Sequence, residues 1–461
     1  MAVNTGEARG ARRAVRIVGG AAAVASRIAA AQPAWCWLDG DAPAPGELAT
    51  SYLGIAAETR EARRGSEREF LAGLAPEGGA VAALSVPGER RSGLTSGWVF
   101  ALGYEFGVAL LGLDAAPDAA APGFALRLDV VLAVTGDRAE LRGETERAID
   151  EWLAAYGELL VGGAEAPERD AEPDRPAGPG SRGEPAGAEP EVTWRRRDDE
   201  YAAEVEACRR AIGDGEAYVL CLTDTAEVAG DFAPLDLFLR LRAGSPAPRG
   251  GVIALPGRAL VSASPERFLS LRGRSVETHP IKGTRPRGAS RAADERLAAE
   301  LAADPKERAE NLMIVDLMRN DLSRVCAPGS VTVSGFLRVE THPHVHQLVS
   351  TVAGELEAGN GFAEVIAACF PGGSMTGAPK RRAVQVLAAL EAGPRGLYAG
   401  CFGWVDGRGD AELGMTIRAA ELRPGRALVG AGGGITADSW PELEVAEKHL
   451  KAAAVLAALR R

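Results

Sequence analysis

The spacing of apolar and polar positions divides the chain into two blocks that each mix strands with helices. In the first block, short apolar runs predict strands at 34–38, 97–102 and 124–134. An amphipathic pattern then predicts a helix at 145–156. Strands and helices therefore alternate irregularly in this block, without a period that would indicate a repeat protein.

The second block begins with a helix, predicted at 199–212, and continues with several short strands. These strands are expected at 218–223, 251–255, 259–263 and 268–272. Short strands that follow one another closely favour hairpins, and hairpins pair their strands antiparallel. The sequence therefore predicts an α+β fold built on antiparallel sheet.

Two longer helices are predicted from their N-terminal sequences. Residues 304–307, DPKE, combine a capping box with a proline in the first turn, which predicts a helix over 306–320. Residues 439–442, SWPE, repeat this signal and predict a C-terminal helix that ends near residue 459. Both helices carry pairs of acidic residues.

A stretch crowded with Pro, Gly, Glu and Asp separates the two blocks. Residues 162–191 have no apolar period and bury too little surface to offset the entropy of ordering, so we expect a flexible linker there. The linker would separate an N-terminal region at 31–161 from a second domain at 192–461. Residues 1–30 are Arg-rich without a secretory signal, and we expect them to form a poorly ordered tail.

Composition and charge argue against several classes of protein. With 52 basic and 63 acidic residues, the formal net charge is −11, whereas binding to a nucleic-acid backbone relies on excess Lys and Arg. No run of about 18 apolar residues is present, so no membrane-spanning helix is expected. The six cysteines are scattered singly, which argues against a zinc framework or a disulfide scaffold and favours a reducing cytoplasm.

Two pairs of glutamates are the first candidates for chemistry. Glu307 and Glu310 share one face of the helix at 306–320, and Glu444 and Glu447 share a face of the C-terminal helix. Carboxylates that meet across a cleft suit a hard cation completed by water and an anionic substrate, which favours Mg²⁺ over zinc. The same spacing is also typical of a solvated helix face, and Glu307 fits the role of a capping glutamate.

Two glycine-rich segments are candidates for binding an anion. Residues 372–380, GGSMTGAPK, lead into an amphipathic helix, where free N–H groups and the helix dipole favour a negative charge. The position of Lys380 does not match a P-loop, and the alternative is a tight turn with a helix cap. Residues 430–434, GAGGG, either bring backbone N–H groups close to a carboxylate or merely permit a bend.

A third candidate is the segment at 280–288, PIKGTRPRG, which places Lys282 among turn residues and two arginines. Only five of the 52 basic residues are lysines, so a lysine within a motif stands out from an arginine background. A lysine becomes a nucleophile where burial or neighbouring cations lower its pKa. The alternative is a solvated basic loop.

Taken together, six segments resemble the chorismate-utilising enzymes in sequence, order and spacing. They are PIKGTRPRG (280–288), KERAENLMIVDLMRNDLSRV (306–325), FPGGSMTGAPKRRA (370–383), GLYAGCFGW (396–404), MTIRAA (415–420) and GAGGGITADSWPELEVAEKHLKA (430–452). The resemblance extends from about residue 192 to the end, and GWVFALGYEFG (97–107) resembles an N-terminal segment of the family. It implies the fold of anthranilate synthase component I, with antiparallel sheets packed as a sandwich under outer helices, and makes 192–461 the chorismate-binding catalytic domain.

The resemblance also implies roles for individual residues. Lys282 matches a covalent nucleophile, and Glu266 matches a general acid. Glu310 and Glu447 match the family's direct Mg²⁺ ligands. Glu307 and Glu444 match the ligands that act through water. The substrate-binding positions are matched by Arg418, Tyr398, Gly432, Gly434, Ser374, Thr284 and Lys380.

Within the family, the details resemble aminodeoxychorismate synthase component I, which replaces the C4 hydroxyl of chorismate by ammonia on the route to para-aminobenzoate and folate. That enzyme has a lysine at the position of Lys282, where anthranilate synthases usually have alanine. Val219 stands where isochorismate and salicylate synthases place a water-activating lysine, and Gln347 where anthranilate synthases commonly have histidine. The alternatives are anthranilate synthase component I, another chorismate-aminating enzyme of secondary metabolism, and a non-catalytic chorismate-binding subunit.

The ammonia is expected to come from another chain. No Gly-x-Cys-x-Gly motif surrounds any of the six cysteines, and no His-x-Glu pair follows them, so the sequence lacks the nucleophile of a class I glutaminase. The resemblance therefore implies a glutamine amidotransferase partner, with free ammonia as its substitute in vitro.

Overall fold

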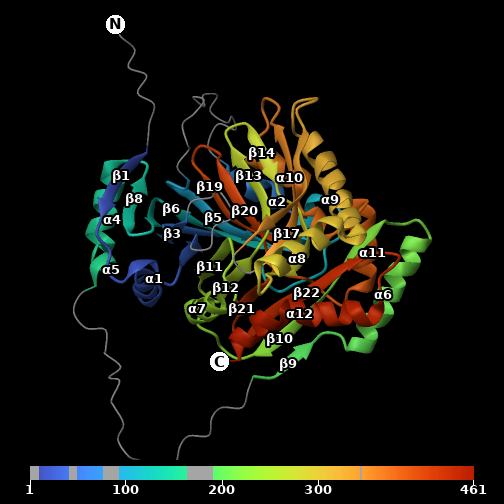
Figure 1. The fold of residues 1–461 in the computed structure, drawn as a ribbon. Helices are drawn as coiled ribbons and strands as arrows, with labels where there is room; N and C mark the ends of the chain where they lie inside the picture. Colours follow the sequence, from blue (N-terminus) through green and yellow to red (C-terminus); the bar gives the residue numbers. More distant parts are fainter. Residues whose placement is uncertain (1–9, 41–48, 76–92, 163–189, 343–344, 461) are drawn as a thin grey trace, which may run out of the picture.

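The computed structural model describes residues 10–40, 49–75, 93–162, 190–342 and 345–460. Across these segments the strands form two large sheets, and helices cover the outer faces of the sheets (Figure 1). Each strand pair in the described segments is antiparallel. The α+β class and the antiparallel sheets expected from the sequence are therefore confirmed.

The first sheet has 12 strands in the order β1-β8-β7-β3-β2-β11-β12-β21-β22-β10-β18, and β9 also pairs with β10. Their bounds are Ala11–Val15 (β1), Arg138–Gly143 (β8), Val130–Thr135 (β7), Thr50–Ile55 (β3), Trp35–Asp39 (β2), Arg249–Leu255 (β11), Arg258–Ser264 (β12), Ala419–Arg423 (β21), Arg426–Ile435 (β22), Val219–Ala229 (β10), Gly377–Ala378 (β18) and Val192–Trp194 (β9).

The second sheet has 10 strands in the order β15-β17-β14-β13-β20-β19-β5-β6-β4, and β16 also pairs with β17. Their bounds are Ile281–Pro286 (β15), Val345–Glu355 (β17), Ser275–Thr278 (β14), Arg267–Arg272 (β13), Ala411–Met415 (β20), Cys401–Asp406 (β19), Gly97–Leu102 (β5), Gly123–Leu128 (β6), Glu58–Glu61 (β4) and Thr332–Thr341 (β16).

The helices and one short 3-10 turn lie outside the sheets. Their bounds are Gly20–Ala31 (α1), Glu67–Leu74 (α2), Tyr104–Leu110 (α3), Glu146–Tyr156 (α4), Glu158–Val161 (α5), Asp198–Gly213 (α6), Pro234–Gly244 (α7), Arg291–Ala303 (α8), Pro305–Ser323 (α9), Phe362–Cys369 (α10), Lys380–Leu390 (α11), Pro441–Leu459 (α12) and Gly373–Met375 (η1).

The hydrophobic core is arranged in layers. A middle layer joins the inner faces of the two sheets, with Leu38 and Ile253 from the first sheet and Phe124 and Phe402 from the second. Outside the first sheet, α1, α4, α7 and α12 bury their apolar sides, and outside the second sheet α2, α3, α9 and α10 do the same. The predicted sandwich with outer helices is confirmed, and it sets α9 and α12 on different sheets.

Both blocks of the sequence contribute strands to both sheets. Strand β2 pairs with β11 in the first sheet, and β5 pairs with β19 in the second. The expected single strand at 124–134 is wrong, because the chain changes sheets at Asp129: β6 pairs in the second sheet and β7 in the first. Most of the linker expected at 162–191 lies outside the described residues.

The expectation of a tail at 1–30 is wrong for the residues that the structure describes. Strand β1 pairs along its whole length with β8. Helix α1 buries Val24, Ala25 and Ile28, and the Arg27 guanidinium donates to the backbone carbonyl of Leu159 at 2.6 Å. The Arg-rich composition obscured an Ala/Val/Ile stripe at helical spacing, which is enough to dock the helix.

Candidate active site

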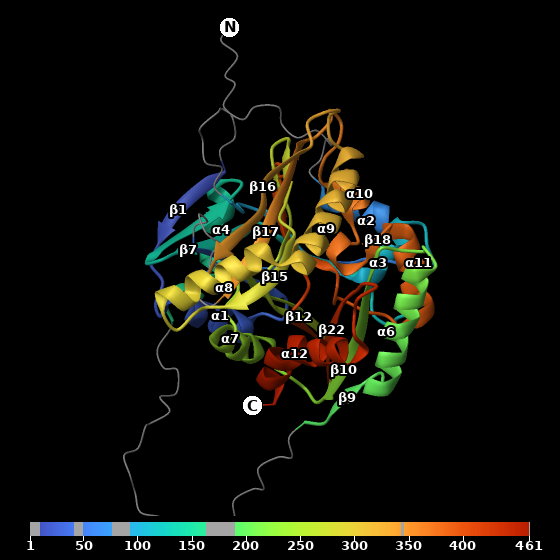
Figure 2. The ribbon, with the colours of Figure 1, turned by 45° about the vertical axis from the view of Figure 1, so that its right-hand side comes forward.

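A cavity of about 580 Å³ lies where β10 and β22 of the first sheet approach β15 of the second. Helices α9 and α12 line it from opposite sides (Figure 2), and η1 and the turn between β12 and β13 complete the wall. The predicted site residues that line this cavity are Lys282, Glu266, Arg418, Tyr398, Gly432, Gly434, Ser374, Thr284, Glu310, Glu447 and Glu307. The two predicted residues that do not line it are Lys380 and Glu444.

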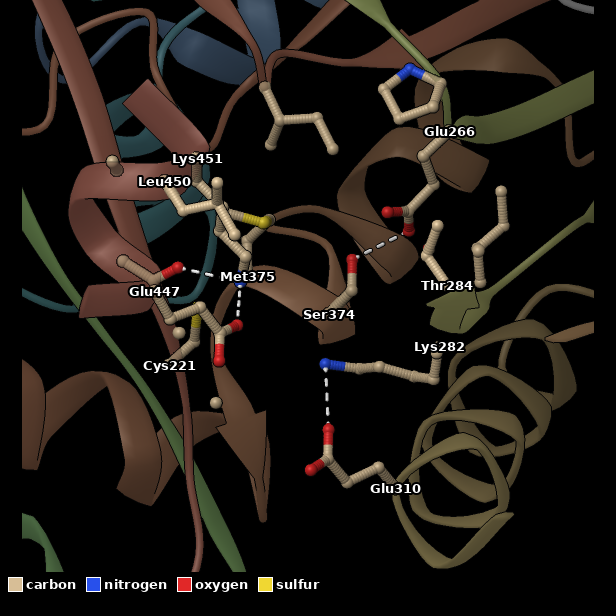
Figure 3. A pocket seen from close by; sticks show the side chains of 18 of the residues that line it. Cys221, Glu266, Lys282, Thr284, Glu310, Ser374, Met375, Glu447, Leu450 and Lys451 are labelled. Carbon is tan, nitrogen blue, oxygen red and sulfur yellow. Dashed lines mark hydrogen bonds and ion pairs between the residues drawn. The ribbon is translucent and has the colours of Figure 1, made fainter. Parts of the chain in front are cut away.

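Lys282 extends from β15 across the cavity (Figure 3). Its Nζ lies 3.6 Å from a carboxylate oxygen of Glu310. A β-carbon added to Gly434 would stand 3.6 Å from the same Nζ, so the amine reaches the backbone of β22. The lysine side chain is only 18% exposed, and the alternative of a solvated basic loop does not hold for it.

The glycine that follows Lys282 allows this close approach. Gly283 has a φ of 80°, which favours glycine. A β-carbon there would stand 2.8 Å from Leu301 and 2.9 Å from the carboxyl carbon of Glu307. The pairing of β15 with β17 also shifts register between Lys282 and Thr284. Gly283 and this bulge together bring β15 against α8 and α9. Lys282 and Thr284, on either side of the glycine, both line the cavity.

The charge of Lys282 is set by its surroundings. Burial lowers the pKa of its amine, but nearby carboxylates, Glu310 first among them, act in the opposite direction and raise that pKa above its ordinary value. The amine is therefore held as an ammonium while Glu310 is its partner. It becomes a nucleophile only when another group compensates the charge of these carboxylates.

Glu266 is the buried acid of the cavity. It follows β12, is 8% exposed, and accepts a hydrogen bond from the Ser374 hydroxyl at 2.9 Å (Figure 3). Burial raises the pKa of its carboxyl group to about 7, although Ser374 and Lys282 oppose that rise. A carboxyl group that is protonated near neutral pH is suited to general-acid catalysis.

Glutamates of α9 and α12 line the cavity from two sides. Glu310 and Glu307 reach it from α9, and Glu447 reaches it from α12, where the Lys451 ammonium lies 2.5 Å from the Glu447 carboxylate. Glu444 is buried beside Gly433, outside the lining, and accepts a hydrogen bond from the Ser439 hydroxyl. Burial, together with the neighbouring carboxylate, raises the pKa values of both Glu307 and Glu444.

Carboxylate oxygens are the ligand type that a hard cation prefers, and such oxygens from two helices line this one cavity. In the described part of the chain, however, no group of three or more His, Cys, Asp or Glu side chains is close enough to hold a metal ion. Lysines contact Glu310 and Glu447 instead. A cation here would therefore bind through Glu310 and Glu447 and complete its shell with water and substrate.

The glycines of β22 let other groups approach its backbone. A β-carbon at Gly430 would stand 2.0 Å from the Tyr398 ring, and one at Gly433 would stand 2.8 Å from the Glu444 carboxylate. In the β10–β22 ladder, Gly432 pairs with Thr223 and Gly434 pairs with Cys221. The glycine-rich segment is therefore a strand that forms a wall of the cavity, not a free loop.

Arg418 and Tyr398 lie on the wall beside this strand. Arg418 has a φ of 52°, a conformation that costs a side-chain-bearing residue free energy and often marks functional positions. Its guanidinium donates to the backbone carbonyl of Lys451 at 3.2 Å, and burial lowers its pKa. Burial also raises the pKa of the Tyr398 hydroxyl, so this side chain stays neutral.

The sequence predicts Lys380 as a substrate-binding residue, but the structure places it outside the cavity lining. It begins α11, is 7% exposed, and its ammonium donates to the Asp321 carboxylate at 2.6 Å and to the Cys369 carbonyl at 2.7 Å. The segment before it folds as η1 and β18, and β18 pairs with β10. This pairing turns the start of the helix, and Lys380 with it, into the core behind the cavity.

We therefore expect Lys380→Met to act on stability. The variant would leave the Asp321 carboxylate buried without its partner, which should lower the free energy of unfolding by about 3–5 kcal/mol. Urea unfolding at pH 7 measures this change. Lys306→Met is the matched control, since its side chain is 58% exposed, and it should cost no more than about 0.5 kcal/mol. Equal costs would contradict the assignment.

The sequence prediction missed several residues of the cavity wall, including Lys451, Lys306 and Cys221. The Lys451 ammonium donates to the Gly432 carbonyl at 2.9 Å and pairs with Glu447 one helical turn before it. Its position could have been inferred, because residues four apart share a helix face. Cys221 stands between Leu220 and Leu222 on β10, and this apolar run gave no reason to expect it in the cavity wall.

The fold and this polar cavity are features of a small-molecule enzyme, and comparison with known proteins specifies the class. The sequence matches the chorismate binding enzyme family over residues 42–457. The chain belongs to this family of chorismate-utilising enzymes. A solved structure of anthranilate synthase component I from Streptococcus pneumoniae is similar in fold, with a TM-score of 0.71 at 22% identity over 99% of this chain and 94% of that chain.

Two curated relatives have different names at similar identity. A 272-residue stretch is 49% identical to aminodeoxychorismate synthase from Streptomyces pristinaespiralis and covers 59% of this chain and 38% of that protein. A 273-residue stretch is 45% identical to anthranilate synthase component 1 from Arthrobacter globiformis, covering 58% of this chain and 51% of that protein. The aligned stretches thus span at most about half the length of these relatives. No helix of the described residues is long and apolar enough to cross a membrane.

Proposed function

We propose that this protein acts as aminodeoxychorismate synthase component I, converting chorismate and ammonia to 4-amino-4-deoxychorismate. The observation that supports it most directly is the presence of Lys282 and Glu266 in one buried cavity. A lysine amine and a carboxyl group that is protonated near neutral pH are the two groups that a covalent route from hydroxyl to amine uses, one as nucleophile and one as general acid. The identity to a protein named aminodeoxychorismate synthase is consistent with this choice.

The proposed reaction proceeds in two displacements. The neutral amine of Lys282 attacks C2 of chorismate while the bond from C4 to its hydroxyl breaks, and Glu266 donates the proton that lets this group leave as water. Ammonia then adds at C4 and expels Lys282 from C2, and the Glu266 carboxylate takes up the proton that the new amine releases. The covalent adduct divides one difficult substitution into two easier steps.

The remaining lining residues would hold the substrate. We propose that Arg418 and Tyr398, which line the cavity, bind the enolpyruvyl carboxylate together with the backbone N–H groups of Gly432 and Gly434. Mg²⁺, when bound, would neutralise the carboxylates and hold the ring carboxylate of the substrate. Its proposed direct ligands are Glu310 and Glu447, and Glu307 and Glu444 are proposed to act through water.

We further propose that ammonia comes from a glutamine amidotransferase subunit and that the product leads to para-aminobenzoate and folate in the cytoplasm. All six cysteines are unpaired and buried, as suits a reducing compartment. The second candidate function is anthranilate synthase component I, favoured by the relative that is 45% identical. It would share the cavity and differ in the position of amination and in pyruvate loss.

Product analysis distinguishes the two candidates. The purified chain is incubated with chorismate, Mg²⁺ and ammonia, aminodeoxychorismate lyase is added to half of the sample, and aminobenzoates are separated by chromatography. We expect 4-aminobenzoate only where the lyase is present. Formation of 2-aminobenzoate without the lyase would establish the second candidate, and full activity with glutamine as the sole nitrogen source would overturn the proposed need for a partner.

A further inference from the structure

A buried arginine lies directly behind the cavity without lining it. Arg395 follows α11, and its side chain is 2% exposed. Four of the five N–H donors of its guanidinium have acceptors: two go to the Glu391 carboxylate at 2.8 and 2.6 Å, and two go to backbone carbonyls. The guanidinium also stacks on the Tyr104 ring, 4.0 Å from its centre. A charge buried this deeply is tolerated only when its partners satisfy it.

The two backbone carbonyls belong to different walls of the cavity. One is that of Met375 in η1, at 2.7 Å, directly after Ser374. The other is that of Cys221 on β10, at 2.9 Å. Both Met375 and Cys221 line the cavity. The guanidinium therefore ties the turn that carries Ser374 to β10, beside the direct hydrogen bond from the Cys221 N–H to the Thr376 carbonyl at 2.9 Å.

The backbone of the same residue anchors a third wall. The N–H groups of Arg395 and Gly396 both donate to the buried Glu105 carboxylate, at 2.7 and 3.0 Å. Tyr398, which lines the cavity, follows two residues later. Glu391 in turn accepts from the backbone N–H and the hydroxyl of Thr223 on β10. The side chain of Arg395 thus contacts two walls of the cavity, and its backbone anchors the third.

We propose that Arg395 is a positioning residue for the general acid. It holds the turn at Ser374 in place, and the Ser374 hydroxyl, 2.9 Å from the Glu266 carboxylate, holds that acid toward the substrate. Arg395 touches no reacting atom, so its effect reaches the reaction through Ser374. The inference rests on the proposed function only in assigning Glu266 as the acid.

The chain offers a matched control for the loss of a buried guanidinium. Arg196 is 5% exposed, pairs with Glu204 at 2.8 Å, and donates to the carbonyls of Thr223 and Leu390. Neither of those two carbonyl residues lines the cavity. Arg196→Lys therefore disturbs the same neighbourhood as Arg395→Lys without moving the turn at Ser374.

A double-mutant cycle tests the proposal, with kcat and KM measured as chorismate consumption in the presence of Mg²⁺ and ammonia. We expect Arg395→Lys to lower kcat about 30-fold while KM for chorismate changes less than about threefold. In a Ser374→Ala background, the same change should lower kcat by less than about threefold, because the path to Glu266 is already broken. Arg196→Lys should leave kcat within about twofold of the parent chain.

The proposal is overturned if Arg395→Lys has equal effects in both backgrounds, or if Arg196→Lys lowers kcat as much. If Arg395→Lys does not fold, Glu391→Gln takes its place, since a glutamine oxygen still accepts from Thr223 while the guanidinium loses its charged partner. The same pattern is then expected. If the parent chain consumes chorismate and forms 2-aminobenzoate, the proposed function is refuted, but the double-mutant cycle still tests the role of Arg395. If the parent chain consumes no chorismate, both the proposed function and the role of Arg395 are overturned.

Discussion

Lys282→Ala is expected to lower the turnover of chorismate with ammonia by about 10³-fold or more, because the variant lacks the nucleophile of the first displacement. The loss should appear in kcat, since the substrate carboxylates are bound by other residues. The free energy of unfolding should fall, because the carboxylates that raise the pKa of this amine stabilise its ammonium form in the folded state, and the variant leaves them without that partner. Steady-state kinetics with saturating Mg²⁺, together with urea unfolding, measure both effects.

A second substitution separates nucleophilic catalysis from charge. Lys282→Arg keeps a positive charge beside Glu310 but provides a guanidinium that is not deprotonated near neutral pH. It should be as inactive as the alanine variant. In the parent chain incubated with chorismate and no ammonia, intact-protein mass spectrometry should detect an adduct of chorismate less water. An active arginine variant would mean that the charge alone matters and would refute the covalent mechanism.

The sequence predicted much of this site through short-range spacing and through the resemblance of its motifs to a known family. Glu307 and Glu310 lie three residues apart on α9, so their common face follows from helix geometry alone. The resemblance of the segment around Lys282 to the chorismate-utilising enzymes predicted a functional lysine, and the structure buries it across from those glutamates. Hairpin spacing likewise predicted the antiparallel sheets. The shared glutamate face and the hairpins need only local periodicity, which is retained whatever the tertiary fold.

The incorrect predictions concern features that depend on tertiary contacts. The apolar run at 124–134 is continuous in sequence, and nothing local indicates that Asp129 divides it between two sheets. Lys380 lies in a glycine-rich motif that favoured an anion site, yet the pairing of β18 with β10 turns it toward Asp321. Arg395 was missed for the same reason, since its partners Met375 and Cys221 are distant in sequence.

Glu266→Gln should lower kcat by roughly 10²- to 10⁴-fold, the range for loss of a general acid. Because burial raises the pKa of Glu266 to about 7, the acid is protonated below that pH and ionised above it. The parent chain should therefore lose kcat/KM as pH rises through about 7, and the variant should lack this limb. Ser374→Ala removes a hydrogen bond that lowers this pKa, so it should move the limb to higher pH.

Stability measurements distinguish this loss of catalysis from a loss of fold. A carboxyl group whose pKa is raised on folding binds more protons in the native state than in the unfolded state between its ordinary pKa of 4.5 and about 7. As pH rises across that interval, the free energy of unfolding of the parent chain should thus fall relative to that of Glu266→Gln. At pH 8 the variant should have a melting temperature equal to or above that of the parent chain. A variant that melts well below the parent at pH 8 would place Glu266 in the structural core. An inactive variant that melts at least as high would show that the protein retains a buried acid at a cost in stability because the reaction needs its proton.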